Sequence, residues 1–293
     1  MPSFFDHRNS CFMSDLESPA CPLCGNKFGK ILYEGGSFAP YGIKSCTCCG
    51  LHYLSPRLKE EGMLAHYAKN QYFSGQAHGY DDYASQEPAL RATFRRLLQT
   101  LAQRGRTGGA LLEIGCGYGY LLDEARPYFS RRVGTDFSSD AVCMAKGNAD
   151  EVYQGGVEAI LGTELFDCVI TTHVIEHVYH PHEFIKTLLK RLRPGGCLMV
   201  AAPDTGSFWR KLMGRRWPSF KLPEHVLYFD HYTLTKLLEG CGVEHPVAIP
   251  YPHAFPLPLI TSKLGFGLPD SLNRYSLWLP ATTIAMIGVK GNA

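Results

Sequence analysis

From residue 110 onward, short apolar runs alternate with segments whose apolar residues recur every three or four positions. The first run covers residues 111–114, and a helical pattern follows it through Leu121, Leu122 and Ala125. The compact runs predict buried strands and the wider spacing predicts amphipathic helices. Six further runs follow, at residues 132–136, 151–154, 166–172, 197–202, 243–249 and 282–290. Strands that alternate with helices predict an α/β protein with a doubly wound, mostly parallel sheet of seven strands.

The pattern before the first of these strands divides the chain further. Residues 1–18 show no consistent period and are predicted to be a flexible tail, while residues 19–56 hold short strand-like runs between cysteine pairs. Residues 57–107 carry two helical patterns and end in a glycine-rich linker. The main domain is then predicted to span residues 108–293, with an insertion at residues 204–232.

A glycine-rich turn joins the first predicted strand to its helix. Gly115, Gly117 and Gly119 follow Glu113, which lies inside the strand. Glycine allows positive φ and close approach of a ligand, and the N-terminus of the following helix presents free amides. A second acid, Asp136, ends the next strand, where it is placed to bind the two hydroxyls of a ribose. The turn is therefore predicted to bind a cofactor that contains a nucleoside.

The order and spacing of these motifs resemble one enzyme family. The loop reads E-x-G-x-G-x-G, which resembles motif I of class I S-adenosylmethionine-dependent methyltransferases and lacks the G-x-G-x-x-G spacing that seats a pyrophosphate. Phe-Asp at 166–167, Glu-His-Val at 176–178 and Leu-Arg-Pro-Gly-Gly at 192–196 match the same family in order. Trp217, the Pro-Glu-His at 223–225 and the leucine-rich run at 233–242 resemble a small-molecule subgroup related to the quinone-biosynthesis O-methyltransferases.

The resemblance implies a Rossmann-like methyltransferase fold whose seventh strand runs antiparallel between the fifth and the sixth. It also implies S-adenosyl-L-methionine as the cofactor and a lid, formed by the helical region before the linker, that folds over it. The cofactor-binding positions that it implies are Glu113, Gly115, Cys116, Gly117, Tyr118, Gly119, Asp136, Phe137, Gly156, Val157, Thr172 and His173, with Tyr67 and Tyr72 from the lid. The segment after the fourth strand lacks the Asn/Asp-Pro-Pro motif of enzymes that methylate base or amide nitrogens, which counts against those acceptors.

Five of the eleven cysteines lie within residues 21–49. Four of them form two C-x-x-C pairs with 21 residues between the pairs, a spacing that is typical of a zinc ribbon. We predict a structural zinc held by Cys21, Cys24, Cys46 and Cys49, with Cys48 as the competing ligand. Because four thiolates leave no open coordination position, the expected role of the metal is to fold a segment that is too small to bury a core of its own.

Histidines supply the candidate catalytic groups. Methyl transfer from a sulfonium requires the protein to position the acceptor, and a hydroxyl acceptor needs a base near neutral pH. His173 and His177 follow the fourth strand and His225 follows the fifth, at the strand ends where open α/β sheets bind ligands. Packing of His177 against the sheet is the alternative to a catalytic role. Position disfavours the other candidates, His231, His245 and His253.

Composition limits the partners. The chain has 29 basic and 27 acidic residues, a net charge of +2, so we expect a small-molecule acceptor and see no strong nucleic-acid signal. No apolar run is long enough to predict a spanning helix. The N-terminal stretch lacks the pattern of a secretory signal, which favours a cytoplasmic location.

Two other functions stay open. An RNA methyltransferase could use the ribbon to grip RNA, and a degenerate fold could serve as a non-catalytic, zinc-dependent interaction module. The RNA hypothesis depends on a set of basic residues with aromatics between them: Arg210, Lys211, Arg215, Arg216 and Lys221 with Trp209, Trp217 and Phe220.

One segment allows several interpretations. Residues 250–280 are rich in proline and apolar side chains, including Trp278 and Leu279. They could line a pocket for a lipophilic acceptor, contact a membrane surface or a second subunit, or cover the edge of the sheet.

Overall fold

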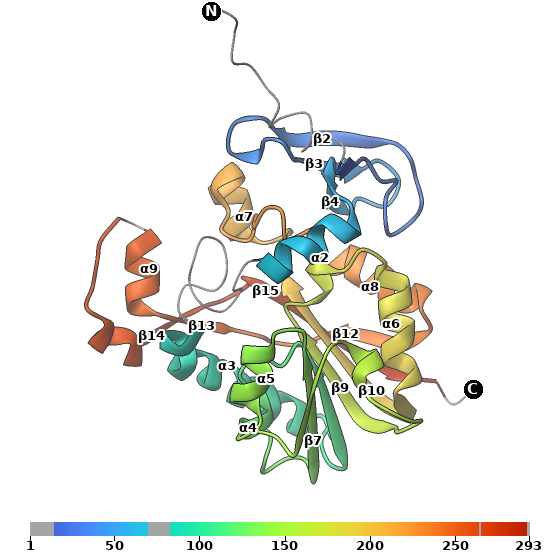
Figure 1. The fold of residues 1–293 in the computed structure, drawn as a ribbon, viewed down its shortest axis with the longest axis vertical. Coiled ribbons are helices and arrows are strands. Elements are labelled where there is room, and N and C mark those ends of the chain that lie inside the picture. Colours follow the sequence, from blue (N-terminus) through green and yellow to red (C-terminus); the bar gives the residue numbers. More distant parts are fainter. Residues whose placement is uncertain (1–14, 70–82, 264, 292–293) are drawn as a thin grey trace, which may run out of the picture.

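The computed structural model describes residues 15–69, 83–263 and 265–291, and a seven-stranded sheet forms its centre (Figure 1). The strand order is β12-β15-β10-β9-β6-β7-β8, in which the five strands from β10 to β8 are parallel and β15 runs antiparallel to both of its neighbours. This confirms the predicted fold, including the antiparallel seventh strand between the fifth and the sixth. The strands are β6 (Ala110–Ile114), β7 (Arg131–Asp136), β8 (Glu151–Gln154), β9 (Phe166–Thr172), β10 (Leu192–Pro203), β12 (Val243–Ala248) and β15 (Thr283–Lys290).

Helices cover both faces of this sheet (Figure 1). Neighbouring residues of β6 enter different cores, Leu111 on the side of α3 and α4 and Leu112 on the side of α6 and α8. Because side chains alternate along a strand, a strand that is buried at every position, as β6 is, must be covered on both faces. The helices are α2 (Glu60–Lys69), α3 (Glu87–Gln103), α4 (Tyr120–Glu124), α5 (Ser139–Ala145), α6 (Pro181–Lys190), α7 (Phe208–Met213), α8 (His231–Gly240) and α9 (Leu257–Lys263).

A serine caps one helix, and one predicted strand is longer in the structure. Helix α5 begins at Ser139, where the Ser138 side chain caps it by accepting a hydrogen bond from the Ala141 amide. Strand β10 begins at Leu192, whereas the apolar run in the sequence predicted a strand only at 197–202. The two glycines at 195 and 196 lie where the register of β10 against β9 is irregular, between Leu192 and Cys197.

A second sheet lies at the N-terminal end of the chain and is completed by a distant segment. Its order is β11-β4-β3-β2, formed by β2 (Gly29–Glu34), β3 (Gly42–Cys46), β4 (His52–Leu54) and β11 (Leu227–Tyr228). We call residues 19–56 the ribbon. Its buried side chains, such as Ile43 and Tyr53, share one core with Leu112 and Ile185 of the main domain. A short pair, β1 (Leu16–Glu17) with β5 (Arg57–Leu58), flanks it.

Residues 250–280 form a hairpin with one helix. Strand β13 (His253–Pro256) pairs with β14 (Ser276–Leu279), and α9 lies between them. The hairpin packs on α3, where the Ala254 amide donates to Thr93 Oγ1 at 2.9 Å and the Arg96 guanidinium lies 4.8 Å from the Trp278 ring centroid. Within the ranges described above, we find no helix whose length and apolarity would let it cross a membrane.

Candidate functional site

The glycine loop between β6 and α4 is fixed by backbone contacts to β7. The amides of Gly115 and Cys116 both donate to the Thr135 carbonyl, at 2.8 and 3.0 Å. Gly115, Gly117 and Gly119 have φ of 74°, 53° and 76°, which side chains other than glycine rarely adopt. A Cβ at Gly115 would overlap Val174 Cγ2. The loop therefore needs glycine for its conformation as well as for space.

Asp136 at the end of β7 ties this loop to the next one. Its two carboxylate oxygens accept hydrogen bonds from the amides of Gly117 and Ser138, both at 2.9 Å. Burial raises the pKa of Asp136, and these two bonds act in the opposite direction. Each oxygen keeps a lone pair for a further donor. The following Phe137 is 71% exposed, so its ring is free to stack on a planar group.

Glu113 is the second acid at the loop. Its side chain is buried, and its Oε2 atom has no hydrogen-bond partner among the described residues. Burial first, and then the nearby charge of Asp136, raises the pKa of Glu113 well above its usual value. A buried, unpaired carboxyl next to another acid suits a cationic ligand. The ammonium and sulfonium groups of S-adenosylmethionine fit this environment, whereas a pyrophosphate would not.

The other predicted cofactor positions follow the ends of β8 and β9. The Gly156 amide donates to Glu158 Oε1 at 2.8 Å, and Val157 is buried beside it. Thr172 ends β9 and is also buried. Cys116 is buried and Tyr118 is half-buried in the glycine loop. All of these positions lie at the carboxyl ends of the parallel strands.

One tyrosine from the region before α3 packs on the glycine loop. Tyr67 belongs to α2, and Tyr72 lies outside the described residues, so their proximity to the cofactor stays a prediction. The tyrosine that packs on the loop is Tyr83, which the sequence pattern did not single out. Its hydroxyl would lie 2.9 Å from a Cβ on Gly117, and its ring stacks on Tyr120 with the ring centroids 5.6 Å apart. Tyrosine is frequent in this stretch, and the pattern alone does not distinguish which ring packs on the glycines.

His173 has a strained backbone at the point where β9 ends. Its φ is 57°, uncommon for a residue other than glycine, and its amide donates to the Ala201 carbonyl at 2.9 Å. Its Nδ1 atom lies 3.4 Å from Glu176 Oε1. Although burial raises the pKa of Glu176, the hydrogen bond and charge of His173, together with the charge of His177, lower it overall. Glu176 is therefore a buried carboxylate that faces two histidines.

His177 and His225 meet although they are far apart in the sequence. Their ring centroids are 4.6 Å apart in an edge-to-face arrangement. Burial lowers the pKa of both imidazoles, and for His225 the charge of His177 lowers it further, to well below the usual range. Both rings are therefore neutral at physiological pH, the form in which imidazole accepts a proton.

His253 is a further member of this group that the sequence analysis set aside. Its ring lies 5.8 Å from His173 and stacks on Phe255 at 4.4 Å. Burial and the charge of His173 lower the pKa of His253 to about 3. It reaches the site because the β13–β14 hairpin folds back over α3, a long-range contact that position along the sheet could not indicate. His231 and His245 remain outside the group, as exposed residues.

Among the residues that the structure describes, two clusters of side chains have the chemistry to hold a metal. In the ribbon, Sγ–Sγ distances are 3.5 Å for both Cys21–Cys49 and Cys24–Cys46, close to what a tetrahedral thiolate site requires. Cys48 is exposed. The second cluster is Glu176, His177 and His225, whose ligand atoms lie within 4.8 Å of one another.

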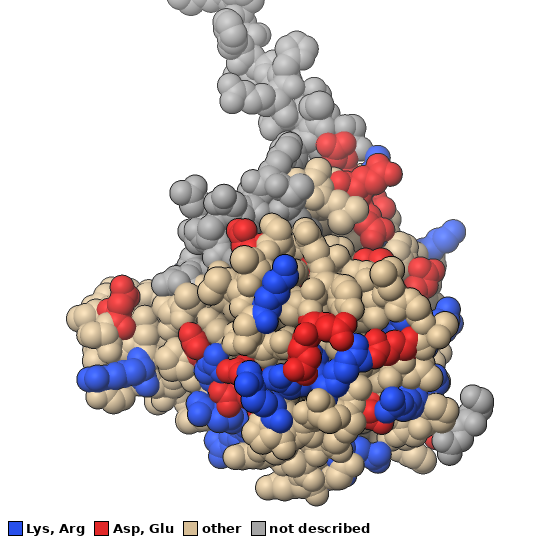
Figure 2. All heavy atoms as spheres, turned by 60° about the horizontal axis from the view of Figure 1, so that its bottom comes forward, with Lys and Arg blue, Asp and Glu red and all other residues tan. Residues whose placement is uncertain are grey.

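The basic residues behind the RNA hypothesis are partly used in internal contacts. Arg215 donates to the Glu34 and Gly35 carbonyls at 2.9 and 3.0 Å. Trp217 is buried, and Phe220 packs edge-to-face on it at 5.1 Å. The face in Figure 2 carries basic and acidic side chains next to one another and no large patch of one sign.

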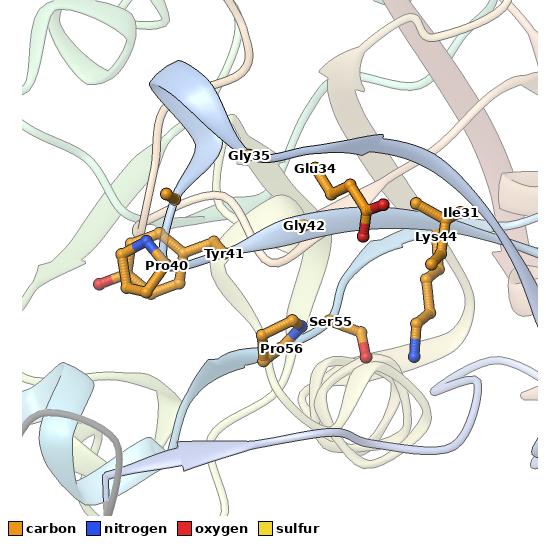
Figure 3. Close-up of a pocket in the computed structure, with 10 residues that line it drawn as sticks. Ile31, Glu34, Gly35, Pro40, Tyr41, Gly42, Lys44, Ser55 and Pro56 are labelled. Atoms are coloured by element: carbon orange, nitrogen blue, oxygen red, sulfur yellow. The ribbon is translucent and has the colours of Figure 1, made fainter. Parts of the chain in front are cut away.

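A cavity of about 320 Å³ lies in the ribbon (Figure 3). Glu34, Tyr41, Lys44 and Ser55 are among the residues that line it. None of the residues predicted from the sequence to bind a cofactor, a metal or an acceptor lines this cavity. The candidate site instead lies at the glycine loop and the histidine group.

Comparison with known proteins points to one protein family. The family described as Methyltransferase domain matches residues 83–245, more than half of the chain. A probable S-adenosylmethionine-dependent methyltransferase of Mycolicibacterium smegmatis is 32% identical over 157 residues, which is 52% of this chain and 59% of that protein. The ubiquinone biosynthesis O-methyltransferase of Caulobacter vibrioides is 36% identical over 121 residues, 35% of this chain and 47% of that protein. The chain thus spans about half the length of these curated relatives.

Solved structures support the fold. A methyltransferase from Thermotoga maritima, described as a possible histamine N-methyltransferase, has a TM-score of 0.52 at 18% identity and covers 72% of this chain and 94% of its own. The magnesium protoporphyrin IX methyltransferase of Synechocystis, solved with bound S-adenosylhomocysteine, has a TM-score of 0.51 at 14% identity and covers 79% of this chain and all of its own. At these identities the likeness extends to the fold alone.

Proposed function

Because the chain belongs to the methyltransferase-domain family, we propose that this S-adenosylmethionine-dependent enzyme methylates an oxygen of a small-molecule acceptor. The observation that carries the proposal is the contact of His177 with His225 just after β9, where Glu176 also faces His173. Val174, in the same turn, lies against Gly115 of the glycine loop. Several curated relatives are ubiquinone biosynthesis O-methyltransferases, which supports oxygen as the receiving atom.

The proposed cofactor site uses the two acids and the glycine loop. Glu113 and the loop would hold the amino-acid end, Asp136 would accept the ribose hydroxyls, and Phe137 and Val157 would contact the adenine. When bound, S-adenosylmethionine supplies a methyl group that is already activated by the sulfonium. The protein's remaining task is to orient the acceptor and to remove its proton.

His225 is our candidate for the general base. Its Nδ1 atom is buried and has no hydrogen-bond partner among the described residues, so it can accept a proton from an acceptor hydroxyl. Glu176 faces His173 and His177 and would stabilise positive charge that develops on this group. His177 would contact His225 and orient its ring.

We also propose that the four ribbon cysteines hold one structural zinc ion. Three of them are buried, and the two 3.5 Å sulfur contacts bring together residues from both knuckles. Four thiolates complete the coordination of zinc, so the proposed metal takes no part in the chemistry.

The test is methyl transfer from isotopically labelled S-adenosylmethionine to a panel of phenols, catechols and hydroxylated quinones, after zinc content has been measured. Calorimetry with S-adenosylhomocysteine is run in parallel on the wild type and Asp136→Ala. Loss of one charged ribose contact should weaken binding by roughly 1.5–3 kcal/mol. Transfer to an amine or carbon acceptor and to no hydroxyl would contradict oxygen as the receiving atom.

A further inference from the structure

We infer that the ribbon is a positioning element of the active site, which holds His225 against His177 through the sheet that it shares with the main domain. The inference rests on the role proposed for His225 and goes beyond the folding role proposed for zinc. It follows from one feature of the topology: β11, which completes the ribbon sheet, begins two residues after His225.

Backbone hydrogen bonds connect the ribbon to both histidine segments. The Leu54 amide at the end of β4 donates to the Val226 carbonyl at 2.9 Å, and the Val226 amide donates to the Glu176 carbonyl at 2.8 Å. Val226 therefore bridges the ribbon and the turn that carries His177. His225 directly precedes Val226 in the chain. Its backbone is therefore held by the ribbon, through Leu54, and by the turn after β9, through Glu176.

Aromatic packing fixes the approach to His225. Phe220 lies edge-to-face with Tyr33 and Phe38 of the ribbon, at 5.4 and 5.6 Å, and with Tyr228 of β11 at 5.3 Å. The Arg215 guanidinium lies 5.0 Å from the Phe38 ring centroid. The segment from Arg215 to Tyr228 thus rests on ribbon residues at both of its ends.

The cysteine cluster lies at the other end of the same strands. Cys46 is the last residue of β3, its amide donates to the Leu51 carbonyl at 2.9 Å, and β4 follows directly. In the shared sheet β4 lies between β3 and β11. Loss of the metal should release the turn between β3 and β4 first, and then β11 with His225. The glycine loop and Asp136 have their own contacts within the main sheet, so the cofactor site should persist.

The experiment is hydrogen–deuterium exchange of the full chain, read by mass spectrometry, for the wild type, Cys46→Ser and the matched control Cys48→Ser. We expect Cys46→Ser to lose zinc and to lose amide protection in residues 224–229, while residues 110–119 stay protected. Binding of S-adenosylhomocysteine should stay within about threefold of the wild type, and turnover should fall about 100-fold, the effect of a small misplacement of a reacting group. Cys48→Ser should match the wild type.

Two results would overturn the inference. One is unchanged protection of residues 224–229 after zinc loss. The other is equal loss of protection in residues 224–229 and in the main sheet, which would make zinc a general stabiliser. Because exchange needs no acceptor, either result is separate from a failure of the proposed O-methylation, which would appear as an absence of transfer by the zinc-loaded wild type.

A second pair of variants tests the link without changing a cysteine. Leu54→Pro removes the amide that donates to Val226, whereas Leu54→Ala removes the side chain and keeps that bond. Turnover and the amide protection of residues 224–229 should both fall more in Leu54→Pro than in Leu54→Ala, by a further factor of at least about ten. Both variants should retain zinc. Equal effects of the two would also contradict the inference.

Discussion

At the residue scale, the candidate site separates two kinds of buried ionisable group. Burial raises the pKa of Glu113 at the glycine loop and lowers the pKa of His225, where we propose that the acceptor binds. A neutral imidazole can take a proton, and an unpaired acid favours a cation. The two environments therefore suit the two partners of a methyl transfer.

The first prediction concerns the base. His225→Asn should lower kcat by about 100-fold or more, because general-base catalysis contributes roughly 10²–10⁴-fold. The dissociation constant for S-adenosylhomocysteine should change little, because the glycine loop is untouched. His245→Asn is the matched control, since His245 is exposed on β12 and Asn tolerates its positive φ of 49°. Equal activity of His225→Asn and the wild type in labelled-methyl assays would rule out this base.

At the scale of elements, the loop between β6 and α4 and the ribbon each depend on a few residues. The loop combines positive φ angles with close contacts to Val174 and Tyr83. The ribbon places Cys21 and Cys24 in a turn before β2, and Cys46 and Cys49 at the turn between β3 and β4. In both, backbone geometry positions the groups that we propose as ligands.

The second prediction tests the loop. Gly115→Ala should weaken binding of S-adenosylhomocysteine by about 1–3 kcal/mol, because the backbone conformation is strained for alanine and the new Cβ overlaps Val174. Gly147→Ala is the control, since nothing lies within 4 Å of a Cβ there. Calorimetry on both variants measures the difference. Tight binding by Gly115→Ala would show that the loop does not form the cofactor site.

The third prediction tests the metal ligands. Cys49→Ser should lose the bound zinc, because Cys49 Sγ lies 3.5 Å from Cys21 Sγ inside the cluster. Cys48→Ser should keep one zinc per chain, because Cys48 is exposed. Elemental analysis of the purified variants distinguishes them, and the reverse result would exchange the two assignments.

At the scale of the whole molecule, one core joins the ribbon to the main domain. Cys49 and Leu51 of the ribbon belong to the same buried cluster as Val169 of β9 and Leu188 of α6. The hairpin of residues 250–280 adds His253 to the other side of the site. The packing of the ribbon and of the hairpin should therefore both influence the geometry around the histidines.

The fourth prediction concerns stability and pH. The pKa of His253 is lowered to about 3, so the folded chain leaves it neutral while the unfolded chain protonates it below its ordinary value of 6.5. Between these two pKa values the unfolded state binds more protons than the folded state. The free energy of unfolding therefore falls as the pH decreases from 6.5 toward 3, by about 1.4 kcal/mol per pH unit for one histidine. His253→Gln should flatten the slope of unfolding free energy between pH 6 and pH 4 by about this amount. Urea unfolding at several pH values measures it, and an unchanged slope would contradict the buried, neutral state.

The sequence by itself determined the periodic features of this protein. Apolar runs and helical spacing were sufficient to predict the doubly wound sheet, and the family resemblance predicted the antiparallel seventh strand. The glycine loop and the cysteine pairs were predictable because their chemistry is local, with ligands a few residues apart.

Only the tertiary structure decided which distant side chains meet. The pairing of β11 with the ribbon, the contact of His177 with His225 and the approach of His253 to His173 join segments that no local pattern relates. Such contacts depend on which faces pack and on the register of strands far apart in the chain. The spacing of apolar residues specifies which face of a helix or strand is buried, whereas the packing of the complete core determines which element covers that face.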